Sequence, residues 1–275
     1  MKKDQKKSRQ IKKKIIFFAL VLLLVWWYNN YTLSVSRTTV ISSKIKNEIK
    51  IVQLSDLHGA SFGKDNRNLI KKVKAQDPDV VFVTGDVYTT GKKQTVQTAF
   101  DLLCALAKDF SVYYVNGEHD YAYQNNDFFT SLENNGVNVM DYKDEIITVK
   151  NTKLHIYGIS NAYYSDTFNL ANAFEKDTKN FTVLLAHIPY FEKFADFGID
   201  LSLCGDTHGG MFRLPYAGAL YDGEDFLPER KGKYIKGMYE LNGSFMFVSG
   251  GLGRYPAPVR FCNRPEISVI NLKPE

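Results

Sequence analysis

Five short clusters of Asp, His, Glu and Gly occur in a fixed order, and each follows an apolar run of the β type. The clusters are Asp56-Leu57-His58, Gly85-Asp86, Gly117-Glu118-His119-Asp120, Ala186-His187 and Gly205-Asp206-Thr207-His208. In an open α/β sheet, ligands bind outside the carboxyl ends of the strands. A series of metal-binding residue types at five successive strand ends therefore predicts one shared site, of the kind that two-metal hydrolases use.

The first half of the chain alternates apolar runs with segments of helical spacing. We expect strands at 48–54, 79–84 and 111–115, and helices at 66–76 and 94–108. This rhythm favours parallel strands joined by crossover helices. The second half is richer in hairpin patterns, with Asn242-Gly243 as the strongest turn signal. Together the two halves predict an α/β protein with two sheets packed face to face and helices outside.

The basic charge of the chain is concentrated at its N-terminus. Residues 1–14 hold eight Lys or Arg against Asp4, a net charge of +7, whereas the whole chain carries +5. The rest of the chain is therefore slightly acidic, with a net charge of −2. A folded part of this kind carries no basic footprint for nucleic acid, and we expect no nucleic-acid partner.

An uncharged apolar run, Ile15 to Tyr28, follows the basic residues, and uncharged residues continue to Ser36. The run is short for a membrane span, which needs about 20 residues, but Trp26, Trp27 and Tyr28 suit a membrane interface. We expect an uncleaved anchor at 15–36, with a cleaved signal peptide or a buried helix as alternatives. The basic bias then predicts a cytoplasmic head at 1–14, a linker at 37–47 and an outward-facing catalytic domain at 48–275.

Two divalent ions about 3.5–4 Å apart need one bridging carboxylate and further ligands on each side. Asp56 and His58 have the spacing to hold the same ion, and Asp86 is the natural bridge. His187 and the pair Asp206 and His208 would complete the two ligand sets. His119 would donate a proton or stabilise the leaving oxygen. Asp120 would orient His119 or serve as a plain cap.

The five clusters, in this order, resemble the signature of the calcineurin-like metallophosphoesterase family. That signature reads D-x-H, G-D, G-N-H-[DE], a later His and G-H-x-H. Over 48–273 the chain is similar to a membrane-anchored bacterial branch with YkuE-like and YaeI-like phosphoesterases and one class of UDP-2,3-diacylglucosamine pyrophosphatase. Leu185-Ala-His-Ile-Pro189 and Val259-Arg-Phe-Cys-Asn-Arg-Pro-Glu-Ile267 carry that similarity. The resemblance implies a four-layer α/β-β/α sandwich. It also implies one metal on Asp56, His58, Asp86 and His208, and another on Asp86, Glu118, His187 and Asp206.

Two of these positions depart from the family pattern. Glu118 stands where G-N-H has Asn, and Asp206 stands where G-H-x-H has its first His. Four carboxylates then surround the two ions in place of two, and oxygen-rich sites favour Mn, Mg or Ca over Zn. We expect two divalent ions, with Mn²⁺ as the first choice and Mg, Ca, Fe or Zn as alternatives. The competing interpretation is that the second metal site is crippled.

The resulting prediction is a membrane-anchored, metal-dependent phosphoesterase in which a metal-bridging hydroxide attacks a diester or pyrophosphate, on a lipid or cell-envelope substrate. The alternative is a catalytically silent envelope protein that binds its ligand and keeps the fold. Arg260 could contact an anionic substrate or lie at the surface or core edge, and His155, outside the motifs, is expected to be structural. The sequence leaves the substrate-binding residues and the oligomeric state open.

Overall fold

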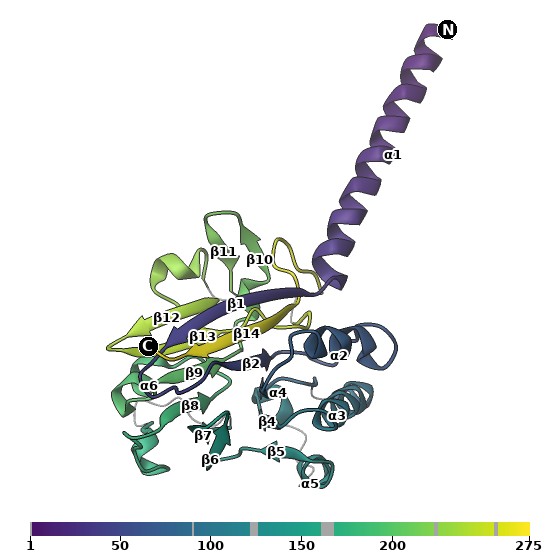
Figure 1. Ribbon diagram of the computed structural model, residues 1–275. Helices are drawn as coiled ribbons and strands as arrows, with labels where there is room; N and C mark the ends of the chain where they lie inside the picture. The colour runs from purple at the N-terminus through teal and green to yellow at the C-terminus, as the bar shows by residue number, and fades with distance from the viewer. Residues whose placement is uncertain (1, 90, 122–125, 161–167, 223–224, 256–257) are drawn as a thin grey trace.

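Two six-stranded sheets pack face to face in the computed structural model, with helices on their outer faces (Figure 1). The structure describes residues 2–89, 91–121, 126–160, 168–222, 225–255 and 258–275. One sheet has the strand order β1-β14-β2-β3-β4-β5, the other the order β12-β13-β9-β8-β7-β6, and β10 and β11 form a separate hairpin. The predicted α/β sandwich of two sheets and outer helices is therefore the observed architecture.

The helices are α1 (Lys2–Tyr31), α2 (Arg67–Lys74), α3 (Lys93–Ala107), α4 (Glu118–Tyr121), α5 (Asn126–Asn134) and α6 (Phe191–Phe197). The strands of the first sheet are β1 (Ser34–Ile41), β2 (Ile49–Leu54), β3 (Val80–Thr84), β4 (Val112–Val115), β5 (Val137–Val139) and β14 (Glu266–Lys273). Those of the second are β6 (Lys143–Val149), β7 (Thr152–Gly158), β8 (Phe181–Leu185), β9 (Leu201–Cys204), β12 (Gly237–Leu241) and β13 (Ser244–Val248). The hairpin consists of β10 (Phe212–Leu214) and β11 (Gly218–Tyr221).

The central strands are apolar throughout because both of their faces are buried. In β3, Val80 and Phe82 point into the core between the sheets, whereas Val81 and Val83 join the core beneath α2, α3 and α5. This alternation follows from the two-residue period of a strand. A third core lies under α6 on the outer face of the second sheet. The packed sheets hold the strand ends rigidly, and the loops that follow them carry the predicted ligands.

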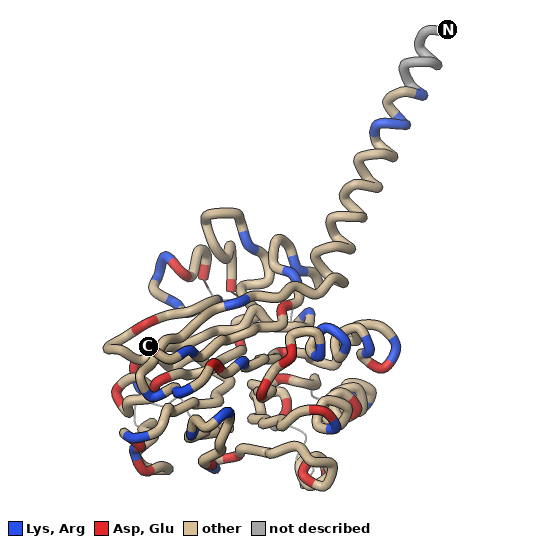
Figure 2. Tube along the Cα trace, viewed as in Figure 1, with Lys and Arg blue, Asp and Glu red and all other residues tan. Residues whose placement is uncertain are grey.

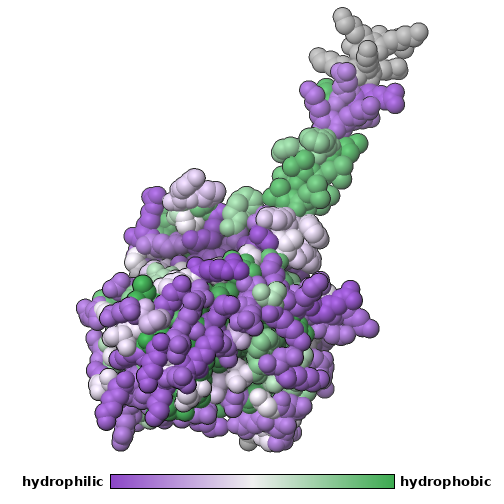
Figure 3. All heavy atoms as spheres, in the orientation of Figure 1, coloured by the Kyte–Doolittle hydropathy of each residue, from purple (hydrophilic) through white to green (hydrophobic). Residues whose placement is uncertain are grey.

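The membrane anchor predicted at 15–36 is wrong. Among the helices that the structure describes, none is both long and apolar enough to cross a membrane. Helix α1 is long, but its apolar part is confined to the segment between the basic head and Asn29 (Figure 3). The apolar run ends at Asn29 and Asn30, two polar residues whose side chains are buried against the domain. The predicted location as a single-pass membrane protein with an outward-facing domain rested on this segment and is wrong with it.

Residues 37–41, expected within a polar linker, form the second half of β1. This edge strand runs parallel to β14, with Ser34 opposite Glu266 and Ile41 opposite Lys273. Only one face of β1 is covered, so polar residues alternate along it, and the segment lacks the apolar signal of a central strand. The Lys and Arg residues of α1 that are coloured in Figure 2 lie far from the domain, where charges of both signs are mixed.

Candidate metal centre

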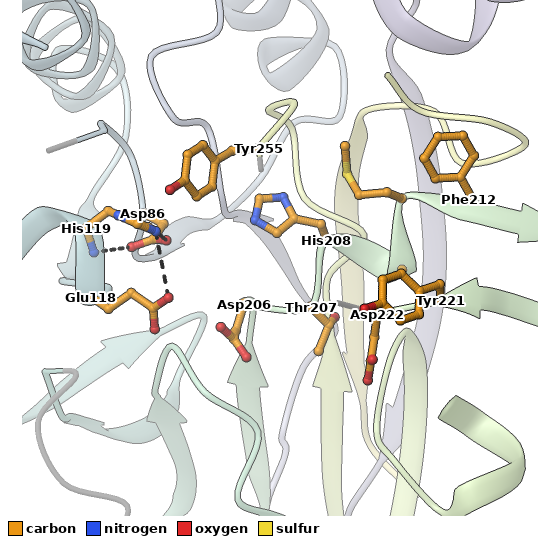
Figure 4. Close-up of a pocket in the computed structure, with 12 residues that line it drawn as sticks. Asp86, Glu118, His119, Asp206, Thr207, His208, Phe212, Tyr221, Asp222 and Tyr255 are labelled. Atoms are coloured by element: carbon orange, nitrogen blue, oxygen red, sulfur yellow. Dashed lines mark hydrogen bonds and ion pairs between the residues drawn. The ribbon is translucent and has the colours of Figure 1, made fainter. Parts of the chain in front are cut away.

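The predicted ligands come together where the strands of both sheets end. Asp56, Asp86 and Glu118 follow β2, β3 and β4 of the first sheet, and His187 and Asp206 follow β8 and β9 of the second. Four overlapping groups have ligand atoms within 4.8 Å of one another: Asp56, His58, His208; Asp56, Asp86, His187; Asp86, Glu118, His119; and Glu118, His187, Asp206. All seven predicted metal ligands and His119 therefore lie in one region. Figure 4 shows five of these eight residues, Asp86, Glu118, His119, Asp206 and His208.

Five of these residues adopt a left-handed backbone. Their φ angles are 52° at Asp56, 47° at His58, 53° at Asp86, 72° at Asp206 and 50° at His208. Non-glycine residues rarely take this conformation, and such strain gathers at functional sites, where the surrounding structure enforces it. Backbone hydrogen bonds from Asp56 N to Gly85 O (3.0 Å) and from His58 N to Asp86 O (2.9 Å) hold two of the turns together.

The glycines of the motifs allow the loops to approach each other closely. A Cβ atom at Gly117 would lie 2.1 Å from Asp86 Oδ1, and one at Gly85 would lie 2.8 Å from His187 Nδ1. Neither position can hold a side chain without displacing a predicted ligand. The close approach also lets the backbone N–H of His119 donate to Asp86 Oδ1 at 3.0 Å.

Asp86 lies between the two predicted ligand sets. Its Oδ2 is 3.4 Å from His58 Nε2 and 3.5 Å from His187 Nε2. On the side of His58, the Nε2 atoms of His58 and His208 are 3.2 Å apart, and His208 Nε2 is 3.9 Å from Asp56 Oδ1. On the other side, His187 Nε2 is 3.9 Å from Asp206 Oδ1. This is the placement expected of a carboxylate that bridges two ions.

The donor set fits divalent cations. His187 Nδ1 lies 2.7 Å from the carbonyl oxygen of Thr84, which can only accept, so Nδ1 carries the proton and Nε2 faces the carboxylates. His187 Nε2 and Asp56 Oδ2 are buried and have no hydrogen-bond partner among the described residues. A cation would satisfy both atoms, and the carbonyl behind His187 fixes the imidazole as such partners do at metal sites.

Burial sets the protonation of the ligands in the absence of a cation. It raises the pKa of Asp56 to about 7 and that of Asp206 to about 6, with nearby carboxylates adding to both shifts. Burial lowers the pKa of His58 to about 3, so this imidazole is neutral. At His187 burial acts to lower the pKa, but the interaction with Asp86 and the charges of Asp56 and Asp206 together outweigh it and raise the pKa well above its usual value. Because metal ligands must be deprotonated, a cation that binds here would displace protons from His187, Asp56 and Asp206.

His119 and Asp120 have different surroundings. His119 is partly exposed, and its Nε2 lies 4.0 Å from Asp86 Oδ2 and 3.8 Å from Glu118 Oε1. Asp120 is fully buried, and its carboxylate accepts from the backbone N–H groups of Tyr88 (3.1 Å) and Gly117 (3.0 Å). These bonds tie the loop after β3 to the loop after β4. Asp120 thus makes the backbone contacts of a cap, the second of the two roles considered from the sequence.

Two further residues lie near the site: Tyr255, which was not singled out in the sequence, and Arg260, which was. The ring of Tyr255 stacks on His58, with centroids 4.6 Å apart, and meets His119 edge-on at 4.7 Å. Arg260, expected at the surface or core edge or against substrate, is fully buried. Its guanidinium donates to the carbonyl oxygens of Gly253 and Gly250, both at 2.7 Å, and of His208 at 3.3 Å. The signal for Arg260 is its place in the stretch Val259–Ile267, and the signal for Tyr255 is the glycine-rich stretch 250–253 just before it.

Known proteins share the sequence of this chain over most of its length. The uncharacterized metallophosphoesterase YkuE of Bacillus subtilis is 28% identical over 231 residues, 82% of this chain and 79% of the relative. An uncharacterized metallophosphoesterase of Aquifex aeolicus is 28% identical over 254 residues, covering 88% and 93%. Residues 49–210 match the family described as calcineurin-like phosphoesterase. Because this match spans more than half of the chain, the protein belongs to the calcineurin-like phosphoesterase family, as its motifs predicted.

Proposed function

We propose that this protein hydrolyses phosphoesters with the help of two divalent ions. Asp56, His58, Asp86 and His208 would hold one ion, and Asp86, Glu118, His187 and Asp206 the other. The observation that carries the proposal is the position of Asp86 Oδ2, 3.4 Å from His58 Nε2 and 3.5 Å from His187 Nε2. Family membership supports a metal-dependent phosphohydrolase.

When bound, such ions supply a nucleophilic water near neutral pH and neutralise the charge that develops on the phosphoryl oxygens. The chain contributes the geometry and the proton transfer. The water oxygen forms a bond to phosphorus, the bond from phosphorus to the organic oxygen breaks, and this oxygen leaves with a proton from His119. His119 suits this role because it lines the cavity, is partly exposed and lies beside Asp86.

We further propose that the second ion is a hard one, with Mn²⁺ preferred. Glu118 and Asp206 add two carboxylates to Asp56 and Asp86, and oxygen ligands favour Mn, Mg or Ca over Zn. The raised pKa of Asp206, caused first by burial and also by the charges of Glu118 and Asp86, reflects this density of carboxylates. A divalent cation would relieve the repulsion among them.

The test is hydrolysis of a chromogenic phosphodiester by the full chain, stripped of metal and then given Mn²⁺, Mg²⁺, Ca²⁺ or Zn²⁺ in turn. Activity that is highest with Mn²⁺ and lost in Asp86→Asn supports both proposals. Highest activity with Zn²⁺, together with full zinc occupancy of both positions in metal analysis, would contradict the proposed metal and leave hydrolysis standing.

Glu118 gives the test a second arm, since its side chain is 45% exposed and is the least enclosed of the proposed ligands. If the folded protein binds ions but hydrolyses nothing with any of them, the chain is a ligand-binding member of its family. Gain of activity in the double variant Glu118→Asn with Asp206→His would then place the defect at the second ion. If the double variant also hydrolyses nothing, Glu118 and Asp206 are not the cause of the missing activity.

A further inference from the structure

The cavity beside the metal centre has a second, apolar side. The cavity has a volume of about 480 Å³, within the range of small-molecule sites. Asp86, Glu118, His119, Asp206 and His208 form its polar side. Met211, Phe212, Tyr221 and Tyr255 also line the cavity, and we call them the apolar face. Phe212 and Tyr221 lie on the side away from Glu118 and His119 (Figure 4). A phosphoryl group at the metal centre would place its organic substituent in the space that the apolar face borders.

The apolar face is held in a fixed position by the hairpin of β10 and β11. Phe212 pairs with Tyr221 across the hairpin. Arg213, which follows Phe212 in the chain, forms an ion pair of 2.9 Å with Glu229. Its guanidinium also donates to the carbonyl oxygen of Gly209 at 2.9 Å. Gly209 directly follows the predicted ligand His208, so the hairpin is anchored to the loop that carries the metal site.

Phe212 and Tyr221 are not core residues. Their relative exposures are 39% and 42%, although large apolar side chains in folded proteins are mostly buried. Both line the cavity, so an occupant would remove part of their surface from water. Tyr255 contributes a third ring, and it also packs on His58 and His119, which places it at the boundary between the apolar face and the metal centre.

The charges of the cavity restrict what can occupy it. Among the residues that the structure describes, the twelve that line the cavity include Asp86, Glu118, Asp206 and Asp222 but no Lys or Arg. Asp222 accepts from Lys233 Nζ at 3.0 Å and from the backbone N–H of Asp225 at 2.7 Å. The charge of a reacting phosphate would be neutralised by the metal ions. A second anionic group farther along the substrate would find no Lys or Arg among the described lining residues to neutralise its charge.

We propose that the apolar face binds the organic group of the phosphoester, and that this group is aromatic or apolar and carries no negative charge. This assignment rests on the proposed hydrolysis, because it takes the reacting phosphate to lie at the metal centre. It predicts discrimination among esters by the group next to the reacting phosphate, with Phe212 and Tyr221 as the residues that determine it.

The test compares three non-hydrolysable ligands by titration calorimetry on the full chain loaded with Mn²⁺: methylphosphonate, phenylphosphonate and 4-carboxyphenylphosphonate. Burying a phenyl ring should make phenylphosphonate bind on the order of tenfold more tightly than methylphosphonate. The added carboxylate should remove this gain. In Phe212→Ser and Tyr221→Ser, methylphosphonate and phenylphosphonate should bind with nearly equal affinity, because phenylphosphonate loses the affinity that its ring contributed.

Leu214→Ser is the matched control, because Leu214 lies on the same hairpin, is 42% exposed and does not line the cavity. It should keep the preference for the phenyl ligand. Equal affinity of the wild type for methyl and phenyl ligands, or loss of the preference in Leu214→Ser, would overturn the role of the apolar face and leave the proposed hydrolysis intact. If the protein binds none of the phosphonates and hydrolyses no phosphoester, both the proposed hydrolysis and the proposed role of the apolar face are wrong.

Discussion

The side chain of Asn30 forms a two-way hydrogen bond with the backbone of Arg260. The N–H of Arg260 donates to Asn30 Oδ1 at 2.8 Å, and Asn30 Nδ2 donates to Arg260 O at 3.1 Å. The guanidinium of the same Arg260 donates to the carbonyl of His208. The end of helix α1 is thereby connected to a predicted metal ligand through a single buried residue.

Replacing Asn30 by Ala should destabilise this connection. The buried N–H and C=O groups of Arg260 would lose their partner, so we expect the free energy of unfolding to fall by about 2 kcal/mol. Urea unfolding followed by tryptophan fluorescence measures it well, because both tryptophans, Trp26 and Trp27, lie on α1. Asn29→Ala is the control: the Asn29 amide donates to Val25 O within the helix, and an equal loss in this variant would speak against the connection.

Replacing Gly117 by Ala should disturb Asp86 specifically. The new Cβ would lie 2.1 Å from Asp86 Oδ1, so the carboxylate must move from its position between His58 and His187. We expect Mn²⁺ affinity to fall by at least about tenfold, as it does when supporting contacts of metal ligands are lost. Gly136→Ala provides the comparison, since its φ of +84° makes Ala strained but nothing lies near the added atom. Metal affinity unchanged in Gly117→Ala would contradict this account.

Adding Mn²⁺ to the metal-free protein should raise its melting temperature. At a concentration 100 times the dissociation constant, binding to the folded state adds about 2.7 kcal/mol, or roughly 5–10 °C for a domain of this size. Asp86→Asn should lose most of this shift because both ligand sets share Asp86. The surface variant Asp65→Asn should keep it. A similar metal-induced shift in Asp86→Asn, measured by scanning calorimetry, would show that the ions stabilise the protein elsewhere.

The stability of the second sheet should depend on Asp177 at acid pH. His155 Nδ1 lies 2.9 Å from Asp177 Oδ2, and its Nε2 lies 2.7 Å from Asp144 Oδ2. Burial alone would raise the pKa of Asp177, but hydrogen bonds from Asn180 and Lys179 and from His155 outweigh it and lower the pKa. A lowered carboxyl pKa stabilises the folded state above the ordinary value near 4, and this contribution is lost as the pH falls below it.

We therefore expect Asp177→Asn to be less stable than the wild type at pH 7 and to lose less stability between pH 4 and pH 2. Thermal unfolding across this pH range makes the measurement. Asp144→Asn, which changes the more exposed partner of the same histidine, should have a smaller effect because solvent screens the pair. Parallel pH profiles for wild type and Asp177→Asn would rule out the assigned pKa shift.

The sequence predicted the buried parallel strands well and the edges poorly. The run 79–84 became β3 (Val80–Thr84) because a strand covered on both faces must be apolar throughout. Strand β1 was missed because only one of its faces is covered, and its partner β14 lies more than 200 residues away in sequence. The anchor was predicted from local hydropathy, which carries no information on the burial of Asn29 and Asn30.

The sequence predicted those residues of the candidate site that belong to motifs at strand ends. Asp56, His58, Asp86, His187 and His208 could be singled out because each closes an apolar run, and the structure brings them together. Tyr255, Phe212 and Tyr221 could not be singled out. A single aromatic residue in a loop or a short hairpin belongs to no periodic pattern that would distinguish a residue lining a cavity from a core residue. The roles of Phe212 and Tyr221 depend on the path of the β10–β11 hairpin, which we did not predict from the sequence.

The position of β14 between β1 and β2 has a consequence for biosynthesis. Glu266–Lys273 pairs with two strands that are synthesised more than 200 residues before it. Until β14 has been synthesised, β1 has no neighbour in the sheet and β2 has an open edge. A chain cut before Glu266 should therefore expose unpaired edges on both strands, and such edges are templates for aggregation.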